Sequence, residues 1–345
     1  MIALILQSDW SALGNRLAEK LIAANHEVTV VVSNGQQNQK LAAVVQEAEI
    51  VITLFSTSQQ VEDAYLGSNG ILEHAAPASL LIDLSTSSPR RAKELHALAA
   101  VHDHRFVEAP LCGDADMFEA DSFRIYAAGE PDNLTKALPI LTALTPDVFE
   151  AGLPGSGVIL KLASQIALAS TLMGVIEAIT FSLVAGMEGP QILKALEKNP
   201  AATAVASTFG RKIIDEDFYY GLELQQFFFD LTAALDAADE YGLALPGLET
   251  AHQLYDLLVL VGGSKKGMHA LALIYYEEER CAQHGLNWGL AQQAMDVYER
   301  ATEGVFDDCE YEDECDDPDC ELHCHRRYDD DPPGPPTMSK FFSAN

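Results

Sequence analysis

The chain has 345 residues, 48% of them hydrophobic, and a formal net charge of -31 at pH 7. This length and hydrophobic content predict two domains with packed cores and a tail. The strong negative charge argues against nucleic acid and anionic membranes as partners, because both are bound by basic surfaces.

Short apolar runs alternate with helical patterns in the first part of the chain. Helical spacing is present at 12–25 and 91–101. Strands are predicted at 2–6, 28–32, 50–54, 80–84, 106–107 and 124–127. Because strands that alternate with helices form βαβ units, we expect an α/β domain over 1–152 with a Rossmann-type, doubly wound parallel sheet.

Strand patterns stop after a turn-rich linker at 152–157. Helices are predicted at 158–186, 190–197, 204–215, 222–241, 247–261, 268–284 and 286–302. We therefore expect an all-α C-terminal domain over 153–302. Its first helix is apolar enough to cross a membrane, but seven polar side chains between 162 and 185 favour a helix buried between domains or in a homodimer.

The remaining segment, 303–345, is a separate acidic tail. Between 303 and 331 it has fourteen Asp and Glu residues against two Arg, which predicts disorder. An alternative is a zinc site, although the spacing lacks paired Cys-x-x-Cys motifs. Its thiol ligands would be Cys309, Cys315, Cys320 and Cys324.

Cysteine usage and the N-terminus bear on the compartment. Cys112 and Cys281 are isolated in the folded part, and the other four cysteines lie in the tail. The start of the chain lacks the basic region of a secretory signal. Both features are typical of a cytoplasmic protein in a reducing compartment.

Lys161 opens the long apolar helix, shortly after Gly155 and Gly157. A buried ammonium is costly unless a partner offsets its loss of water. A lysine behind two glycines at the start of a buried helix indicates a catalytic acid/base or an anion anchor. The alternatives are a lysine that extends to solvent from the first turn, or a pairing with Asp114.

The turn after the first strand is where a dinucleotide fold holds the cofactor pyrophosphate. Only Gly14 stands where a fingerprint glycine belongs. Ser8 and Ser11 could donate hydrogen bonds to phosphate, whereas Asp9 would repel it. The end of the second strand carries no charge that would choose between NAD and NADP. Its polar residues are Ser33 and Asn34.

Three further segments carry recognisable motifs. Asp83-Leu-Ser-Thr-Ser-Ser-Pro89 contains Asp-x-Ser-Thr-x-x-Pro, Glu108-Ala-Pro-Leu-Cys-Gly-Asp114 follows a strand, and a Gly-x-Gly-x-x-x-Lys motif ends at Lys161. In this order they resemble the signature, substrate loop and catalytic segment of the β-hydroxyacid dehydrogenase family. That family includes 3-hydroxyisobutyrate dehydrogenase and tartronate semialdehyde reductase. The resemblance runs from residue 1 to about residue 285.

The resemblance implies an NAD(P)-dependent oxidoreductase that transfers a hydride between nicotinamide and a small 3-hydroxy acid or its semialdehyde. Lys161 would be the general acid/base, with Ser164 and Gln165 in the place of the family's orienting asparagines. The substrate carboxylate would lie against Cys112, Gly113 and Asp114. The cofactor would contact Ser8, Ser11, Gly14, Ser33, Asn34, Phe55, Ser56, Thr86 and Phe229.

Three departures separate the chain from the family pattern. The glycine fingerprint is mostly lost, Asp114 replaces a glycine, and Phe229 stands where the family has a lysine before an Asp-Leu pair. The alternative is therefore a non-catalytic or cofactor-defective member that acts as a binding module, with the Cys/His tail as its working part.

Overall fold

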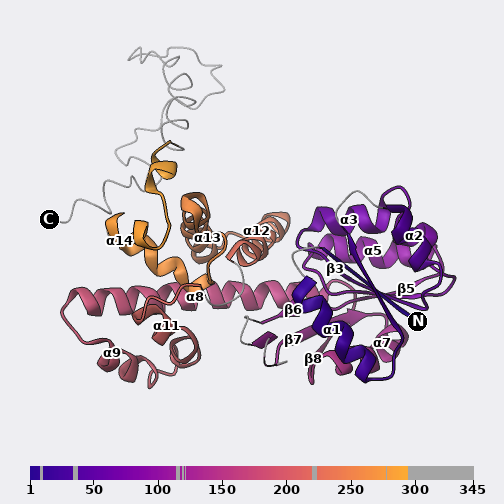
Figure 1. Ribbon diagram of the computed structural model, residues 1–345, viewed down its shortest axis with the longest axis horizontal. Coiled ribbons are helices and arrows are strands. Elements are labelled where there is room, and N and C mark those ends of the chain that lie inside the picture. The colour runs from indigo at the N-terminus through magenta and orange to yellow at the C-terminus, as the bar shows by residue number, and fades with distance from the viewer. Residues whose placement is uncertain are drawn as a thin grey trace, which may run out of the picture. The chain divides into compact units, whose positions relative to one another are not determined.

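A computed structural model describes the main elements of the chain (Figure 1). The described residues are 1–7, 11–33, 38–113, 117–118, 120, 122–219, 224–276 and 278–293. Met1–Ala291 forms one compact unit, in which an α/β part is followed by helices. The predicted tail lies outside the described residues.

The α/β part is built on one eight-stranded sheet, in the order β2-β1-β3-β4-β5-β7-β6, with β8 paired to β7. Its strands are β1 (Ile2–Gln7), β2 (Val28–Ser33), β3 (Ile50–Leu54), β4 (Leu80–Asp83), β5 (Arg105–Glu108), β6 (Leu111–Cys112), β7 (Arg124–Gly129) and β8 (Asp147–Gly152). The first five are parallel, as predicted, whereas β7 runs antiparallel to β5 and β6. The Rossmann-type fold is confirmed, with a mixed rather than an all-parallel sheet.

Helices cover both faces of this sheet (Figure 1). One layer holds α1 (Ser11–Ala23) and α7 (Pro131–Leu144). The other holds α2 (Asn38–Val45), α3 (Ser58–Leu66), α4 (Ile71–His74) and α5 (Pro89–Val101). Because successive strand residues point to opposite faces, Leu4 packs into the core with α1 and α7, while Ile5 packs into the core under α2 to α5.

Six elements of the α/β part have no counterpart among the sequence predictions, namely α2, α3, α4, β6, α7 and β8. Pro139 lies inside α7, and a proline in a helical pattern normally marks a break. Strand β8 is exposed or half-buried along its length, so it lacks the apolar run of a buried strand.

The helical part begins with α8 (Ser156–Val184), which packs against α12, α13 and η4. The later elements are α9 (Gly189–Leu196), α10 (Thr203–Val205), η2 (Ala206–Gly210), α11 (Arg211–Ile214), α12 (Leu224–Glu240), α13 (Pro246–Leu258), η3 (Val259–Gly263), η4 (Met268–Tyr275) and α14 (Glu278–Gln283). The single helix predicted at 268–284 is wrong, because a 3-10 helix and a short α-helix occupy that range. Of the helix predicted at 286–302, residues 288–293 are helical, and 294–302 lie outside the described residues.

By length and composition, α8 could cross a membrane. A second span is possible if two segments joined by a sharp bend, Pro246–Gly263 (α13 with η3) and Met268–Tyr275 (η4), are counted as one. The core helix of a soluble protein passes the same test.

Candidate active site

The N-terminus of α8 is held by a buried carboxylate. Glu108, at the end of β5, accepts hydrogen bonds from the backbone amides of Gly155 at 3.0 Å and Gly157 at 2.8 Å. Negative charge is favourable at a helix N-terminus, where the first amides lack partners within the helix. A side chain at Gly157 would place its Cβ 2.4 Å from the carbonyl oxygen of Tyr126. Residue 157 must therefore be glycine for α8 to pack here, and this packing fixes Lys161 one turn later.

Lys161 is buried, and its ammonium has two partners. Its Nζ atom donates to the Thr86 hydroxyl and lies 3.1 Å from Oδ2 of Asp230. Thr86 follows β4, and Asp230 lies on α12, so three separate elements meet at this ammonium. The alternative of a lysine that extends to solvent is wrong, since only 7% of its side chain is exposed. Asp114, the other expected partner, lies outside the described residues.

Asp230 also accepts hydrogen bonds from two amide side chains. Gln165, one turn after Lys161 on α8, donates from Nε2 to Oδ2 of Asp230 at 2.7 Å. Gln226, one turn before Asp230 on α12, donates from Nε2 to Oδ1 at 3.4 Å. The same Nε2 atom lies 3.4 Å from the carbonyl oxygen of Ser56. Gln226 therefore connects the ion pair to the loop after β3.

A pocket opens beside these groups. It is lined by Leu54, Phe55, Leu84, Ser85, Thr86, Leu111, Gly113, Phe118, Lys161, Gln165 and Gln226. Several of these residues follow the carboxyl ends of β3 and β4. The strand order reverses between β1 and β3, and ligands of open α/β sheets bind at the carboxyl edge near such a reversal.

A buried network fixes the two loops that border the pocket. Oδ1 of Asp83 accepts hydrogen bonds from the hydroxyls of Ser85 at 2.6 Å and Thr53 at 2.9 Å. Ser85 Oγ in turn accepts from the backbone amide of Phe55 at 2.8 Å. Burial raises the pKa of the Asp83 carboxyl. Burial, and then the charge of Asp83, raise the pKa of Tyr65, whose hydroxyl lies 2.9 Å from Thr53 Oγ1.

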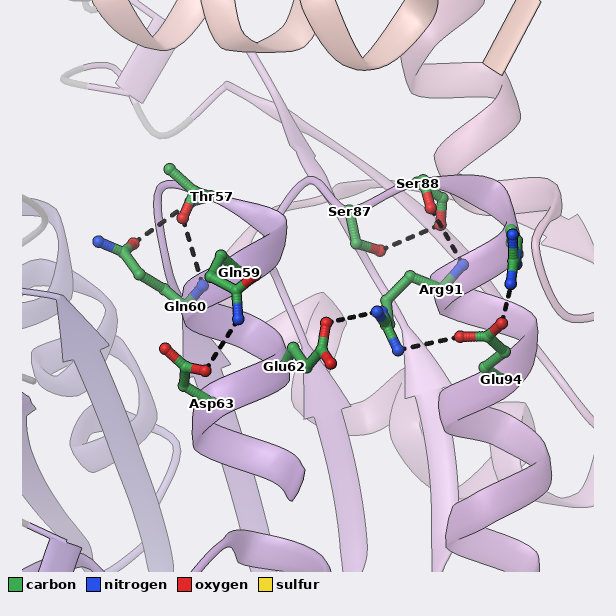
Figure 2. A network of polar contacts seen from close by, with 10 residues as sticks. Thr57, Gln59, Gln60, Glu62, Asp63, Ser87, Ser88, Arg91 and Glu94 are labelled. Carbon is green, nitrogen blue, oxygen red and sulfur yellow. Dashed lines mark hydrogen bonds and ion pairs between the residues drawn. The ribbon is translucent and has the colours of Figure 1, made fainter. Parts of the chain in front are cut away.

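The helices that follow these two loops are capped and tied together (Figure 2). Thr57 and Gln60 form a reciprocal capping box at the start of α3, and Ser88 caps α5 by accepting from the amide of Arg91. Figure 2 also shows the ion pair from Arg91 on α5 to Glu62 on α3. These contacts hold the starts of α3 and α5 in one arrangement beside the pocket.

Five predicted site residues line the pocket together. They are Lys161, Gln165, Gly113, Phe55 and Thr86. A Cβ at Gly113 would lie 3.1 Å from that of Phe123, so this close packing favours glycine.

Other predicted site residues are placed differently. The hydroxyl of Ser164 is 2.7 Å from that of Tyr126 and donates to the Leu160 carbonyl, away from the lining residues. Phe229 is half-buried and Ser56 contributes its carbonyl to Gln226; neither lines the pocket. Cys112 is half-buried at the end of β6, and burial raises the pKa of its thiol.

The predicted pyrophosphate and ribose residues are described only in part. Ser11 begins α1, Gly14 is buried in its first turn, and Ser33 ends β2. Ser8, Asn34 and Asp114 lie outside the described residues, as do Cys309, Cys315, Cys320 and Cys324. Within the described residues, no three His, Cys, Asp or Glu side chains are close enough together to hold a metal ion.

Sequence reasoning missed Asp230 and Gln226 as site residues. Asp230 was noted only as the residue after Phe229, where the family lysine was expected. The spacing of Gln226 and Asp230 is i, i+4, which puts both on one helix face. Two polar residues on one face of an otherwise apolar helix segment could have indicated that this face of α12 borders a polar site.

Two family models match this chain, one over the α/β part and the other over the helical part. Residues 11–152 match the family model of the NAD binding domain of 6-phosphogluconate dehydrogenase. Residues 155–275 match the model described as NAD-binding of NADP-dependent 3-hydroxyisobutyrate dehydrogenase.

Individual relatives agree with these models. Probable 3-hydroxyisobutyrate dehydrogenase-like 1, mitochondrial, from Arabidopsis thaliana is 29% identical over 273 residues, covering 76% of this chain and 81% of that protein. Uncharacterized oxidoreductase YkwC from Bacillus subtilis is 27% identical over 270 residues, covering 75% and 94%. The solved structure of Mycobacterium tuberculosis 3-hydroxyisobutyrate dehydrogenase with L-serine has a TM-score of 0.71 at 22% identity, covering 80% of this chain and all of that one. At this identity the solved structure shows a shared fold.

Proposed function

The chain belongs to the β-hydroxyacid dehydrogenase family, and we propose that it transfers a hydride between NAD or NADP and a small 3-hydroxy acid or its semialdehyde. One observation carries this proposal: the buried ammonium of Lys161 lies at the pocket, between Thr86 and Asp230. A buried, hydrogen-bonded lysine in a cleft at the carboxyl edge of a Rossmann-type sheet suits a proton-transfer role.

The lining residues suit a nicotinamide nucleotide. Leu54, Phe55 and Leu84 offer apolar walls for the flat ring, and the hydroxyls of Ser85 and Thr86 suit ribose hydroxyls or a carboxamide. When bound, the nicotinamide supplies or accepts the hydride.

Lys161 would move the proton that accompanies the hydride. In the reduction direction its ammonium gives a proton to the carbonyl oxygen, and in the oxidation direction its neutral amine takes the hydroxyl proton. Asp230 holds Nζ in place, while Gln165 holds Asp230. Thr86 accepts a hydrogen bond from the same ammonium. This contact would fix the position of the proton donor relative to the loop after β4, which would contact the cofactor.

Cys112, Gly113 and Asp114 would border the substrate carboxylate. Gly113 lines the pocket together with Lys161. Cys112 is close enough to Lys161 and Asp230 for their charges to act on the pKa of its thiol. The names of the relatives support a small hydroxy acid: one is called 3-hydroxyisobutyrate dehydrogenase-like, and a solved one is described with L-serine.

A homodimer is the assembly that suits α8. Only 28% of its most apolar window is buried within the chain, although the helix is apolar along its length. A second copy of the chain would cover the remaining face.

Titration of the purified chain with NADPH and with NADH, followed by nicotinamide fluorescence, tests the function. Micromolar binding of either, together with oxidation of a 3-hydroxy acid that is lost in Lys161→Met, would support it. No binding of either cofactor at millimolar concentration would overturn it and favour the non-catalytic binding module.

A further inference from the structure

A buried histidine lies outside the pocket lining and has no part in the proposed proton transfer. Nε2 of His96, on α5, is 3.6 Å from Oε2 of Glu108, and only 7% and 3% of the two side chains are exposed. We infer that His96 is a positioning residue: its protonation acts through Glu108 on the start of α8, which carries Lys161. This inference rests on the proposed hydride transfer and adds a pH-sensitive control to it.

The ring nitrogen that faces Glu108 has no hydrogen bond. Nε2 of His96 is buried without a hydrogen-bond partner among the described residues, and 3.6 Å exceeds the length of such a bond. The ring itself is held in place, since it meets Phe106 edge-on at 4.8 Å between centroids and its Cε1 atom would be 3.3 Å from a Cβ at Gly129. A buried polar atom without a partner is unfavourable, so a change that brings Nε2 and Oε2 together would be favourable.

A proton on this nitrogen would supply that change. A neutral imidazole donates from only one ring nitrogen, whereas an imidazolium donates from both. Charge-assisted hydrogen bonds between a cation and a carboxylate are about 2.7–2.9 Å long. Protonated His96 would therefore draw Oε2 of Glu108 toward Nε2.

The elements packed against this pair add little charge. Helix α5 contributes Lys93, an exposed side chain whose Cε atom would be 2.7 Å from a Cβ at Gly155. Strand β7 meets the ring with the uncharged Gly129, and residues 155–160 of α8 contain no acid or base. An ammonium at the surface is screened and opposes an imidazolium only weakly. Glu108 is therefore the charged partner that decides what protonation of His96 does.

Oε2 of Glu108 also caps the start of α8. It accepts from the amide of Gly155 at 3.0 Å, while Oε1 accepts from the amide of Gly157 at 2.8 Å. A carboxylate drawn toward His96 would weaken these bonds. Gly155 has a φ of 91° and could follow the carboxylate, because glycine adopts positive φ without strain. Lys161 lies one turn further along α8, so its ammonium would move with the helix start.

The helix that carries His96 begins beside a partner of Lys161. Helix α5 starts at Pro89, three residues after Thr86, which accepts a hydrogen bond from Lys161. The contact between His96 and Glu108 thus joins α5 to the start of α8. With neutral His96 the alignment of Lys161 with Thr86 is kept. With protonated His96 we expect this alignment to be lost and turnover to fall.

A measurement without turnover tests the structural half of the inference. The chain is labelled with ¹³C in the histidine rings and ¹⁵N in glycine, and NMR spectra are recorded between pH 5 and 8, the range in which histidines change charge. We expect the amide signals of Gly155 and Gly157 to shift with the same midpoint as the ring of His96, and to lose that shift in His96→Gln. Amide signals that stay constant while the ring titrates, or a ring that does not titrate in this range, would overturn the inference.

The pH profile of carbonyl reduction tests the catalytic half. In this direction Lys161 must carry its proton, so acid favours its active form and does not by itself lower the rate. We expect kcat for reduction of malonate semialdehyde by NADH or NADPH to fall about tenfold between pH 7.5 and 5.5 in the unchanged chain. It should stay nearly constant in His96→Gln, which takes up no proton. His102→Gln, at the exposed C-cap of the same helix, is the matched control and should keep the fall.

The same assays separate positioning from cofactor binding and from folding. The loss in acid should appear in kcat, while Kd for the cofactor changes by less than about twofold. Thermal unfolding shows whether each variant is folded, and His96→Phe, which keeps an aromatic contact with Phe106, replaces His96→Gln if the latter is not. A loss carried by Kd, or an acid-side fall that persists in a folded His96 variant, would overturn the role of His96 and leave the proposed function standing. Absence of cofactor binding and of any turnover would instead overturn the proposed function, and the glycine amides would still decide whether His96 acts on α8.

Discussion

The Nζ atom of Lys161 lies 3.1 Å from Oδ2 of Asp230, and only 7% and 1% of their side chains are exposed. The two residues are 69 positions apart and come from α8 and α12. Each charge offsets the cost of removing the other from water, and hydrogen bonds from Thr86 and Gln165 complete the arrangement. Removing one partner would leave an unpaired buried charge.

Replacing the proposed acid/base should therefore affect both turnover and stability. In Lys161→Met we expect kcat to fall about 10²–10⁴-fold, the range for a lost general acid/base, with cofactor binding retained. Stability should fall by about 3–5 kcal/mol, because Asp230 loses its cation. Steady-state kinetics and urea unfolding measure the two effects.

The double variant Lys161→Met with Asp230→Asn is the control for the stability effect. It removes the orphaned charge, so most of the stability should return while turnover stays low. Turnover at the unchanged level in Lys161→Met would refute the proposed mechanism.

Glu108 offers a prediction about the start of α8. In Glu108→Ala the amides of Gly155 and Gly157 lose their acceptor in a buried place, and we expect a loss of about 2–4 kcal/mol. Glu108→Gln keeps one of the two acceptor oxygens and no charge, so it should cost less than Glu108→Ala, by about 1 kcal/mol or more. Urea unfolding compares the two variants, and equal stability of Glu108→Ala and Glu108→Gln would contradict the capping role.

The residues of the site that sequence reasoning found share one property. Thr86, Lys161 and Gln165 belong to short motifs, in which residue type and spacing within a few positions carry the information. Asp230 and Gln226 meet them only because α12 packs against α8, and no local pattern encodes that packing. The identity of the partner of Lys161 is set by tertiary structure, so the sequence left Asp114 and solvent as alternatives.

The same distinction applies to the fold. Parallel strands β1, β3 and β4 are largely buried on both faces and appear in the sequence as continuous apolar runs, so their order along the chain could be predicted. Strand β8 reaches solvent and borders only β7, which leaves no apolar run to detect. The antiparallel direction of β7 depends on the short connections around β6, and the direction of a strand has no signature in its own residues.

Asp83 predicts a pH dependence of stability. Burial raises the pKa of its carboxyl in the folded chain, so the native state binds more protons than the unfolded state between the ordinary Asp pKa, about 3.9, and the raised value. Stability contributed by this group is greatest in acid and falls as pH rises through that window. Asp83→Asn keeps the Oδ1 acceptor for Thr53 and Ser85 without a charge.

The difference in unfolding free energy between Asp83→Asn and the unchanged chain isolates this group. It should be near its minimum in acid and grow in favour of Asp83→Asn toward neutral pH, by about 1.4 kcal/mol for each pH unit that separates the two pKa values. Urea midpoints between pH 4 and 8 give the curve. A difference that moves the opposite way would mean that the folded chain favours the charged carboxyl.

The exposed face of α8 predicts a dimer. Phe181 and Val184 are 77% and 84% exposed near its C-terminal end, and none of the residues that the structure describes buries them. We expect the unchanged chain to be a dimer at micromolar concentration, and Phe181→Glu with Val184→Glu to be a monomer, because a buried interface does not tolerate two unpaired carboxylates. Val101→Glu is the matched control, since Val101 is 78% exposed at the end of α5 in the α/β part. Light scattering after size-exclusion chromatography measures the mass of each. A monomeric unchanged chain would refute the dimer, and its recovery only with detergent or vesicles would assign this face to lipid.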